Sequence, residues 1–321
     1  MKRYIAIARP DHWIKNVFML PGIIFAYIVG AKNYMQDYSW SAFLLRFLFG
    51  VVSLCLVASA NYVINEYLDA QSDKFHPTKK ERVGVKLGLN PKLVYTEYAL
   101  LIVAGLGLAW LCGKNFFFIS VFLLIMGFFY NVKPFRTKDV AYLDVLSESV
   151  NNAIRLAMGW FLLSEGFNAA QVAASPDFVS PVYPVSSLII GYWMGGAFLM
   201  AVKRYSEYRF IDDKSTASLY RKSFKHYTEN SLLLSSIFYG MISLFFVGIF
   251  IIKYRIEYII LIPFIAVLFC WYLWLGMKED SVAQKPEKLY KQWKLFAFLL
   301  LMAAIGVVLS FVDIPVLDVL Y

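Results

Sequence analysis

Residues 42–74 read AFLLRFLFGVVSLCLVASANYVINEYLDAQSDK, an apolar run that ends in amides and acids. Up to about residue 64 the run holds a single charged side chain, Arg46. A helix needs roughly 20 mostly apolar residues to cross a bilayer, so this part predicts a membrane span. Asn65, Glu66, Asp69 and Asp73 follow where that span would leave the membrane. The stretch therefore predicts a helical membrane fold and a polar site at its surface.

The rest of the chain has the same character. Of its 321 residues 60% are apolar and only 17% are charged, which is too apolar for a soluble globule of this size. Nine runs are candidate spans, at about 16–33, 42–64, 92–111, 115–130, 142–164, 182–202, 230–252, 256–276 and 294–312. No soluble domain or long linker separates them. We therefore expect an all-α, polytopic membrane protein in which residues 1–321 form a single domain of nine transmembrane helices.

The basic residues are distributed unevenly between the two sides. Loops on one side hold 25 Lys and Arg residues and those on the other hold four. By the positive-inside rule, this predicts a multi-pass protein of the cell (inner or plasma) membrane with a cytoplasmic N-terminus and an outside C-terminus. Because loop placement explains the net charge of +9, nucleic acid is not expected as a partner.

The acidic stretch is the strongest candidate for chemistry. If the helix continues, Asn61, Asn65, Asp69 and Asp73 recur every four residues on one face, with Glu66 close by. Carboxylates at that spacing repel one another unless a cation neutralises them, and oxygen ligands of this kind favour Mg²⁺ shared with substrate phosphates. The alternative is a solvated acidic helix end.

A basic run follows the acids directly, with His76, Lys79, Lys80 and Arg82. Cations beside a metal–carboxylate site suit a diphosphate leaving group. An ordinary positive-inside loop would look the same by itself, and adjacency to the acids is what favours the phosphate site.

Two further polar clusters are predicted on the same side of the membrane. The first contains Tyr130, Lys133 and Arg136 and continues along one helical face through Asp144, Glu148, Asn151, Asn152 and Arg155. Ionisable groups at that depth usually mark a functional cavity, although a network that only specifies packing is the alternative. The second cluster, at the end of the sixth span, contains Lys203, Arg204 and Glu207. We expect all these clusters to meet at one cytoplasmic mouth.

These motifs resemble a known family. Asn65-Glu66-x-x-Asp69-x-x-x-Asp73 resembles the Asn-Asp-x-x-Asp-x-x-x-Asp signature of the UbiA superfamily of membrane prenyltransferases, and Tyr130-x-x-Lys133 resembles its Tyr-x-x-x-Lys-type segment. Within it, Arg9-Pro10-x-x-Trp13-x-Lys15-Asn16 and Asp73-x-x-His76-Pro77-x-Lys79-Lys80-x-Arg82 are similar to motifs of decaprenyl-phosphate phosphoribosyltransferases. Glu66 replaces the usual first Asp, Val83-Gly84-Val85 replaces a Pro-Ile-Ala-like stretch, and no strong second Asp motif follows the sixth span.

The resemblance implies a reaction and a set of roles. It implies Mg²⁺-dependent transfer of 5-phosphoribose from 5-phosphoribosyl-1-diphosphate to a membrane polyprenyl phosphate such as decaprenyl phosphate, with release of diphosphate. Asn65, Glu66, Asp69 and Asp73 would hold Mg²⁺ and diphosphate, and Lys79, Lys80 and Arg82 the 5-phosphate or diphosphate. Tyr130, Lys133 and Arg155 would hold the lipid phosphate or the departing group, with Lys203, Arg204 and Glu207 closing the site. Lys15, His76, Arg136 and Asp144 complete the expected substrate-binding set.

Three alternatives stay open. The same metal site would also serve a prenyltransferase that joins a polyprenyl diphosphate to an aromatic or other small acceptor. A transporter could use the polar face from Glu148 to Arg155 as its path, although the chain shows no inverted repeat. The sequence also leaves a homo-oligomer open.

Overall fold

A computed structural model describes residues 2–76, 79–86, 88–174, 182–211, 214–278, 281–284 and 292–320. Across these residues the chain is helical, without strands, which confirms the predicted all-α membrane class. Each of the nine predicted ranges overlaps a helix, but within the described part of the chain eight helices are both long and apolar enough to cross a membrane. The helix of the remaining range, α7 (Leu143–Ser164), has the length but carries the polar face that includes Asp144, Glu148 and Arg155.

The chain divides into two compact units, and each is described by itself. The first comprises Met1–Pro184 and Asp213–His226, and the second Val185–Asp212 and Tyr227–Tyr321. The single domain expected from the sequence stays a prediction.

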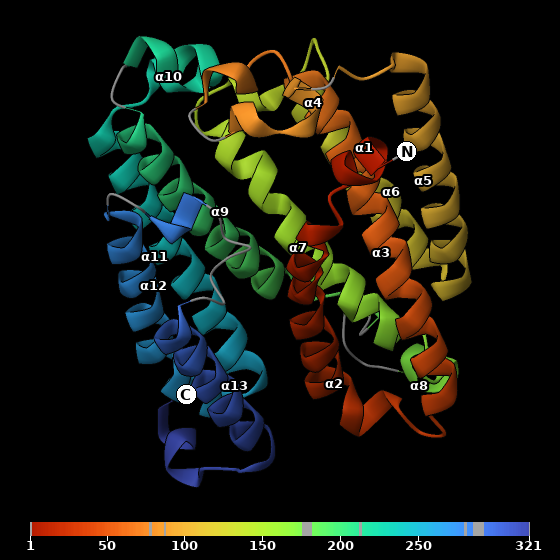
Figure 1. Cartoon of the computed structure of the whole chain (residues 1–321). Helices are drawn as coiled ribbons and strands as arrows, with labels where there is room; N and C mark the ends of the chain where they lie inside the picture. Colours follow the sequence, from red (N-terminus) through yellow and green to blue (C-terminus); the bar gives the residue numbers. More distant parts are fainter. Residues whose placement is uncertain are drawn as a thin grey trace. The chain divides into compact units, whose positions relative to one another are not determined.

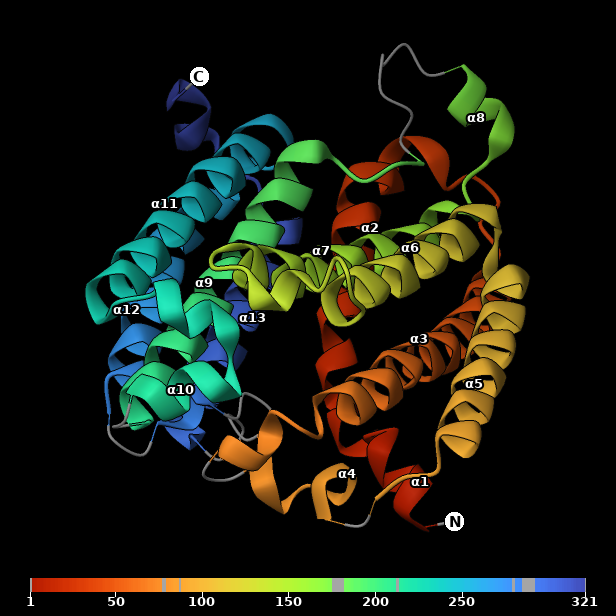
Figure 2. The same cartoon turned by 90° about the horizontal axis from the view of Figure 1, so that it is seen from above.

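The first unit holds most of the predicted site residues. Its helices are α1 (Lys2–Ile7), η1 (Pro10–Met19), α2 (Leu20–Tyr34), α3 (Trp40–Asp69), η2 (Asp73–Phe75), η3 (Lys79–Glu81), α4 (Val83–Lys86), α5 (Pro91–Cys112), α6 (Lys114–Asn131), η4 (Thr137–Asp139), α7, α8 (Ala169–Ala173), α10 (Lys214–Tyr220) and η5 (Lys222–His226). In two views α3 runs beside α5, and α2 lies along α7 (Figures 1 and 2).

Glycine sets the distance between α2 and α7. A Cβ added at Gly22 would lie 1.9 Å from the Leu156 carbonyl oxygen, and one at Gly159 would lie 1.9 Å from that of Met19. Small residues at such positions let helix backbones approach closely in a membrane, where packing drives helix association. The two glycines therefore bring the N-terminal segment against the middle of α7.

The second unit is built on α9 (Ser186–Phe210) and α11 (Glu229–Tyr254), which pack along each other. Its other elements are η6 (Ile256–Leu261), α12 (Ile262–Gly276), η7 (Val282–Gln284), α13 (Trp293–Phe311) and η9 (Pro315–Leu320). Arg255 joins η6 to the end of α13, because its guanidinium donates to the carbonyl oxygens of Leu309 and Val312 and pairs with Asp313.

The C-terminal end of α3 differs from the prediction that the helix continues through Asp73. α3 is 30 residues long and carries the apolar run out to Asp69, where the helix ends. Asp73 lies beyond it in the separate turn η2. The face from Asn61 to Asp69 is thus helical, whereas Asp73 reaches the site through a turn.

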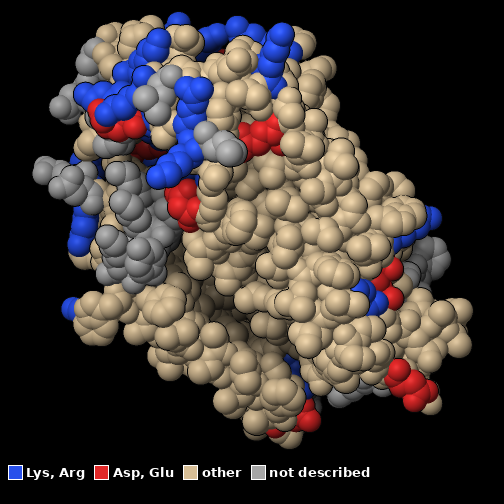
Figure 3. Space-filling model, turned by 45° about the vertical axis from the view of Figure 1, so that its right-hand side comes forward, with Lys and Arg blue, Asp and Glu red and all other residues tan. Residues whose placement is uncertain are grey.

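Charged side chains are concentrated on part of the surface. In the space-filling view Lys and Arg gather at one end of the face shown, and a broad band without charged side chains adjoins them (Figure 3). Such a band is what contact with lipid requires, and the protein is a multi-pass membrane protein.

Candidate functional site

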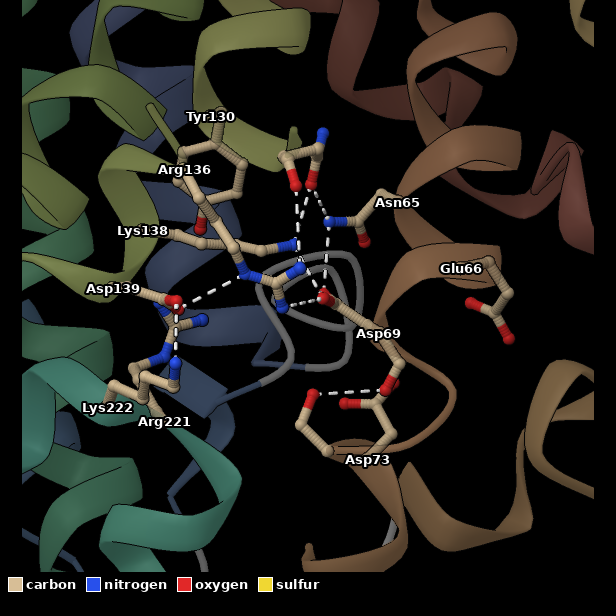
Figure 4. A network of polar contacts seen from close by, with 12 residues as sticks. Asn65, Glu66, Asp69, Asp73, Tyr130, Arg136, Lys138, Asp139, Arg221 and Lys222 are labelled. Atoms are coloured by element: carbon tan, nitrogen blue, oxygen red, sulfur yellow. Dashed lines mark hydrogen bonds and ion pairs between the residues drawn. The ribbon is translucent and has the colours of Figure 1, made fainter. Parts of the chain in front are cut away.

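Asp69, the last residue of α3, is the centre of the polar network in the first unit (Figure 4). Its Oδ1 accepts from Lys138 Nζ at 2.5 Å and from Arg136 Nη2 at 3.0 Å. Its Oδ2 accepts from Asn65 Nδ2 at 3.2 Å, one helical turn back. Asp69 therefore meets two cations from the loop after α6 and an amide from its own helix.

Asn131, the last residue of α6, links these groups. Its Oδ1 accepts from Asn65 Nδ2 at 2.5 Å and from Lys138 Nζ at 2.7 Å, and its Nδ2 donates to the Gly127 carbonyl oxygen. Because Asn131 is buried and bonded at both ends of its amide, it fixes the end of α6 against that of α3.

Lys138 belongs to this polar network, although no motif in the sequence indicated it. Its side chain is 5% exposed, and its Nζ lies 5.5 Å from the centre of the Tyr130 ring. Burial lowers the pKa of Lys138 to about 8, although Asp69 opposes the shift, and Arg136 lowers it further. Lys133, which the motif had favoured, is exposed.

Asp73 forms a second, adjoining ion pair. It is 3% exposed, and its Oδ2 lies 2.7 Å from Arg82 Nη1. Burial raises the pKa of Asp73, Arg82 and Lys79 oppose that shift, and the charge of Asp69 adds to it. The two aspartates therefore lie close enough to repel each other.

Glu66 lies apart from this pair. Its carboxylate lies apart from that of Asp69 (Figure 4), 3.6 Å from Arg82 and 3.7 Å from Arg9. The backbone N–H of Gly84 donates to it, and a Cβ at residue 84 would lie 3.2 Å from Glu66 Cγ. Val83-Gly84-Val85, which departs from the family pattern, thus packs against the residue that also departs from it.

The metal ligands expected from the sequence fit Mg²⁺ in part. Asn65, Asp69 and Asp73 offer amide and carboxylate oxygens of the kind that Mg²⁺ prefers. Among the described residues, however, no three His, Cys, Asp or Glu side chains are arranged to hold a metal ion by themselves. The arrangement fits Mg²⁺ shared with phosphate oxygens, while the carboxylate of Glu66 lies near Arg9 and Arg82, and its predicted role as a metal ligand stays a prediction.

The basic run after η2 divides into buried and exposed residues. Lys79 Nζ donates to the Tyr220 hydroxyl, and the rings of His76 and Tyr220 lie 4.5 Å apart. Lys80 is exposed, and Pro77 lies outside the described residues. Tyr220, the last residue of α10, therefore holds both His76 and Lys79. No pattern in the sequence linked α10 to the basic run.

The segment formed by α10 and η5 contributes further side chains to the first unit. Arg221 Nη1 lies 3.5 Å from Asp144 Oδ2, and the Ser223 hydroxyl donates to the same oxygen at 3.1 Å. Lys222 Nζ lies 3.7 Å from Asp139 Oδ2. Asp144 is fully buried, and Arg221 and Ser223 compensate its negative charge. No spacing in the sequence indicated that residues 214–226 lie against the start of α7.

The polar face of α7 continues along the helix beyond Asp144. The Tyr130 hydroxyl donates to Glu148 Oε2 at 2.8 Å. Deeper along the helix, Arg155 Nε donates to Asn16 Oδ1 at 3.1 Å. Lys15, by contrast, contacts His12 on its own segment, at 3.2 Å.

The remaining predicted residues belong to the second unit. Arg204 pairs with Glu207 at 3.0 Å, and both side chains are completely buried. Lys203 is half-buried on the same helix, α9. These three residues form a local cluster at the end of α9, and their part in the site stays a prediction.

Known proteins resemble this chain along most of its length. The sequence model described as the UbiA prenyltransferase family matches residues 19–302. The decaprenyl-phosphate phosphoribosyltransferase of Mycolicibacterium smegmatis is 29% identical over 71% of this chain and 63% of its own length. The protoheme IX farnesyltransferase of Sodalis glossinidius is 24% identical over 65% of this chain and 63% of its own length. The chain thus spans just under two thirds of these relatives.

Solved structures share the fold. A UbiA homologue from Archaeoglobus fulgidus, bound to GPP and Mg²⁺, matches with a TM-score of 0.66 at 16% identity, over 97% of this chain and 100% of its own. A digeranylgeranylglyceryl phosphate synthase matches with a TM-score of 0.57 at 15% identity, over 96% of each chain. Because the sequence model covers most of the chain and the fold agrees, this protein belongs to the UbiA prenyltransferase family.

Proposed function

We propose that this protein transfers 5-phosphoribose from 5-phosphoribosyl-1-diphosphate to a membrane polyprenyl phosphate and releases diphosphate. The observation that carries the proposal is the density of cations around Asp69 and Asp73. Arg136 and Lys138 contact Asp69, and Arg82 contacts Asp73. A donor with a diphosphate and a 5-phosphate needs more cationic partners than a prenyl diphosphate does. The likeness to decaprenyl-phosphate phosphoribosyltransferases supports the same choice.

The leaving group would bind at the end of α3. Asn65, Asp69 and Asp73 would hold Mg²⁺, which supplies charge neutralisation of the diphosphate as the bond to ribose C1 breaks. Arg136 and Lys138, which now contact Asp69, would turn to the diphosphate oxygens, because charge-assisted bonds to phosphate are strong. In this proposal the ion pairs of the free protein keep the carboxylates compensated until substrate arrives.

The other end of the donor would bind the basic run. Lys79 and Arg82 are anchored by Tyr220 and Asp73 and would hold the 5-phosphate. Exposed Lys80 and Lys133 would act as outer contacts, and Lys203, Arg204 and Glu207 would close the site. Because the acceptor phosphate is already anionic, it needs positioning more than a general base.

The second candidate is prenyl transfer from a polyprenyl diphosphate to a small acceptor. The likeness to protoheme IX farnesyltransferases and to a fold neighbour solved with GPP and Mg²⁺ favours it. Both reactions break a carbon–diphosphate bond, so the end of α3 would serve either.

One assay separates the two candidates. Purified protein receives either labelled phosphoribosyl diphosphate with polyprenyl phosphate, or a polyprenyl diphosphate with 4-hydroxybenzoate as the trial acceptor, each with Mg²⁺. We expect a labelled, phosphoribosylated lipid from the first pair. Product from the second pair alone would replace the proposal with prenyl transfer.

The remaining expectations form part of the same proposal. A cytoplasmic N-terminus would place the end of α3 on the cytosolic side of the membrane. There the water-soluble donor, phosphoribosyl diphosphate, would reach the site from the cytosol. The cell membrane would supply the lipid acceptor.

A further inference from the structure

Arg155 is a buried cation in the middle of α7, which packs against the candidate membrane spans α2, α3 and α6. It is the thirteenth of the 22 residues of α7 and is 7% exposed. Among the described residues no carboxylate lies within ion-pair distance of its guanidinium, whereas Asp69, Asp73 and Glu66 all have Lys or Arg partners. Charged side chains at such depth are costly and mark functional positions by default.

Neutral groups hold the guanidinium in place. Nε donates to Asn16 Oδ1 at 3.1 Å, and Nη1 donates to the Asn151 carbonyl oxygen at 3.3 Å. Asn16 in turn donates to Cys55 Sγ on α3 at 3.3 Å. Three segments of the first unit therefore meet at Arg155 and supply dipoles but no negative charge.

Asn151 adds an unused acceptor beside this cation. Its Nδ2 donates to the Glu148 carbonyl oxygen at 3.1 Å, which fixes the orientation of the amide. Its Oδ1 is buried, and the described residues provide it with no hydrogen-bond donor. The site thus offers a fixed positive charge and, one turn away, an acceptor. A phosphate monoester matches both, since it has oxyanions and, when singly protonated, a hydroxyl.

The position of Arg155 indicates which phosphate binds there. Along α7 it lies seven residues beyond Glu148, whose partner Tyr130 adjoins Lys138, and seven residues span roughly 10 Å. In an in-line displacement the attacking oxygen approaches ribose C1 from the side opposite to the departing diphosphate. If diphosphate binds at the end of α3, the acceptor phosphate comes from deeper in the membrane.

We infer that Arg155 and Asn151 form a separate subsite for the phosphate monoester of the isoprenoid acceptor. The inference rests on the proposed function for the direction of attack. A lipid phosphate oxygen forms the bond to C1, and the C1–O bond to diphosphate breaks with its electron pair leaving on the diphosphate. Arg155 is then the residue that gives the acceptor phosphate a cation not shared with the leaving group.

The test is a binding measurement that requires no turnover. Purified protein in lipid nanodiscs is titrated with farnesyl phosphate, farnesol and ribose 5-phosphate, for the unchanged chain and for Arg155→Gln, Arg155→Lys and Asn151→Asp. Arg46→Gln is the matched control, because Arg46 is also an intramembrane arginine of the first unit but contacts Tyr38 instead. We expect Arg155→Gln to weaken farnesyl phosphate binding by about 10- to 100-fold, the range for losing a charged hydrogen bond.

The other arms distinguish a subsite from a structural tether. Arg155→Lys should restore much of the affinity, and Asn151→Asp should weaken it because the new carboxylate competes for the guanidinium. Farnesol binding should change little in any variant. Unchanged farnesyl phosphate affinity in Arg155→Gln, or equal losses for phosphate and alcohol, would overturn the inference.

Ribose 5-phosphate identifies the source of the phosphate. If Arg155→Gln weakens ribose 5-phosphate and spares farnesyl phosphate, the group belongs to the donor and the acceptor subsite is refuted. If Arg155→Gln does not fold, Asn151→Asp carries the same comparison. A protein that shows the expected pattern but transfers no phosphoribose would refute the proposed function alone.

Discussion

Lys138 Nζ lies 2.5 Å from Asp69 Oδ1, so a loop residue after α6 neutralises the last residue of α3. The pair is buried, since the side chains of Lys138 and Asp69 are 5% and 16% exposed. A lysine in this position can move from the carboxylate to an arriving phosphate without a new charge entering the site.

The first prediction compares two lysines of that loop. Lys138→Gln should lower the rate of transfer at least tenfold, because a charge-assisted hydrogen bond to diphosphate contributes about 1.5–3 kcal/mol. Lys133→Gln should cost clearly less, since Lys133 is exposed. Steady-state kinetics with varied phosphoribosyl diphosphate measure both. A larger loss in Lys133→Gln would refute the assignment of Lys138.

The second prediction concerns the direct metal ligands. Asp73→Asn should raise the Mg²⁺ concentration needed for half-maximal activity. The reason is that Asp73 lies close enough to Asp69 for the two negative charges to repel each other, and a cation between them would relieve that repulsion. Glu66→Gln should leave that concentration within about twofold, since its carboxylate binds Arg9 and Arg82 instead. Mg²⁺ titrations of activity check this. An equal shift in both variants would return Glu66 to the ligand set.

The third prediction tests the burial of Asp144. Arg221→Gln should destabilise the protein by roughly 3 kcal/mol, because it removes a cationic partner from the fully buried carboxylate of Asp144. Asp144→Asn in the same chain should recover much of that loss. Reversible unfolding in SDS mixed micelles gives the free energies, and additive losses would show that the two residues are not coupled.

The fourth prediction concerns the contact between α2 and α7. Gly159→Ala should destabilise the first unit, because the new methyl group would meet the Met19 carbonyl oxygen. The matched control is Gly107→Ala in α5, where a Cβ would have nothing within 4 Å. Alanine is favoured over glycine in a helix by up to about 1 kcal/mol, so the control should be neutral or slightly stabilising. Thermal unfolding in detergent compares them, and equal behaviour would contradict the close approach.

Much of the fold was predictable because each membrane helix is a run of about 20 mostly apolar residues, which is visible in the local composition of the sequence. The apolar runs matched helices, and α7 is polar because its inner face bears Asp144 and Arg155. The acidic motif indicated the polar network around Asp69 for the same reason, since Asn65 and Asp69 share one helix.

The partners of those residues were not predictable. Lys138 was missed because only the path of the loop after α6 turns it toward Asp69 and leaves Lys133 exposed. Arg221 was missed because it lies 77 positions from Asp144 in the chain, and no local pattern records that contact. Asp73 lies near Asp69, as its spacing suggested, but it reaches this position through a turn and not through a continued helix.

Transfer of phosphoribose by Asp69→Asn protein tests the central proposal most directly. Membranes that contain the unchanged chain or the variant receive labelled phosphoribosyl diphosphate, polyprenyl phosphate and Mg²⁺, and the labelled lipid is separated and counted. We expect labelled lipid from the unchanged chain, none without Mg²⁺, and a loss of at least about 100-fold in a variant that is still folded and inserted. Labelled lipid at the unchanged rate from Asp69→Asn, or none from the unchanged chain, would contradict it.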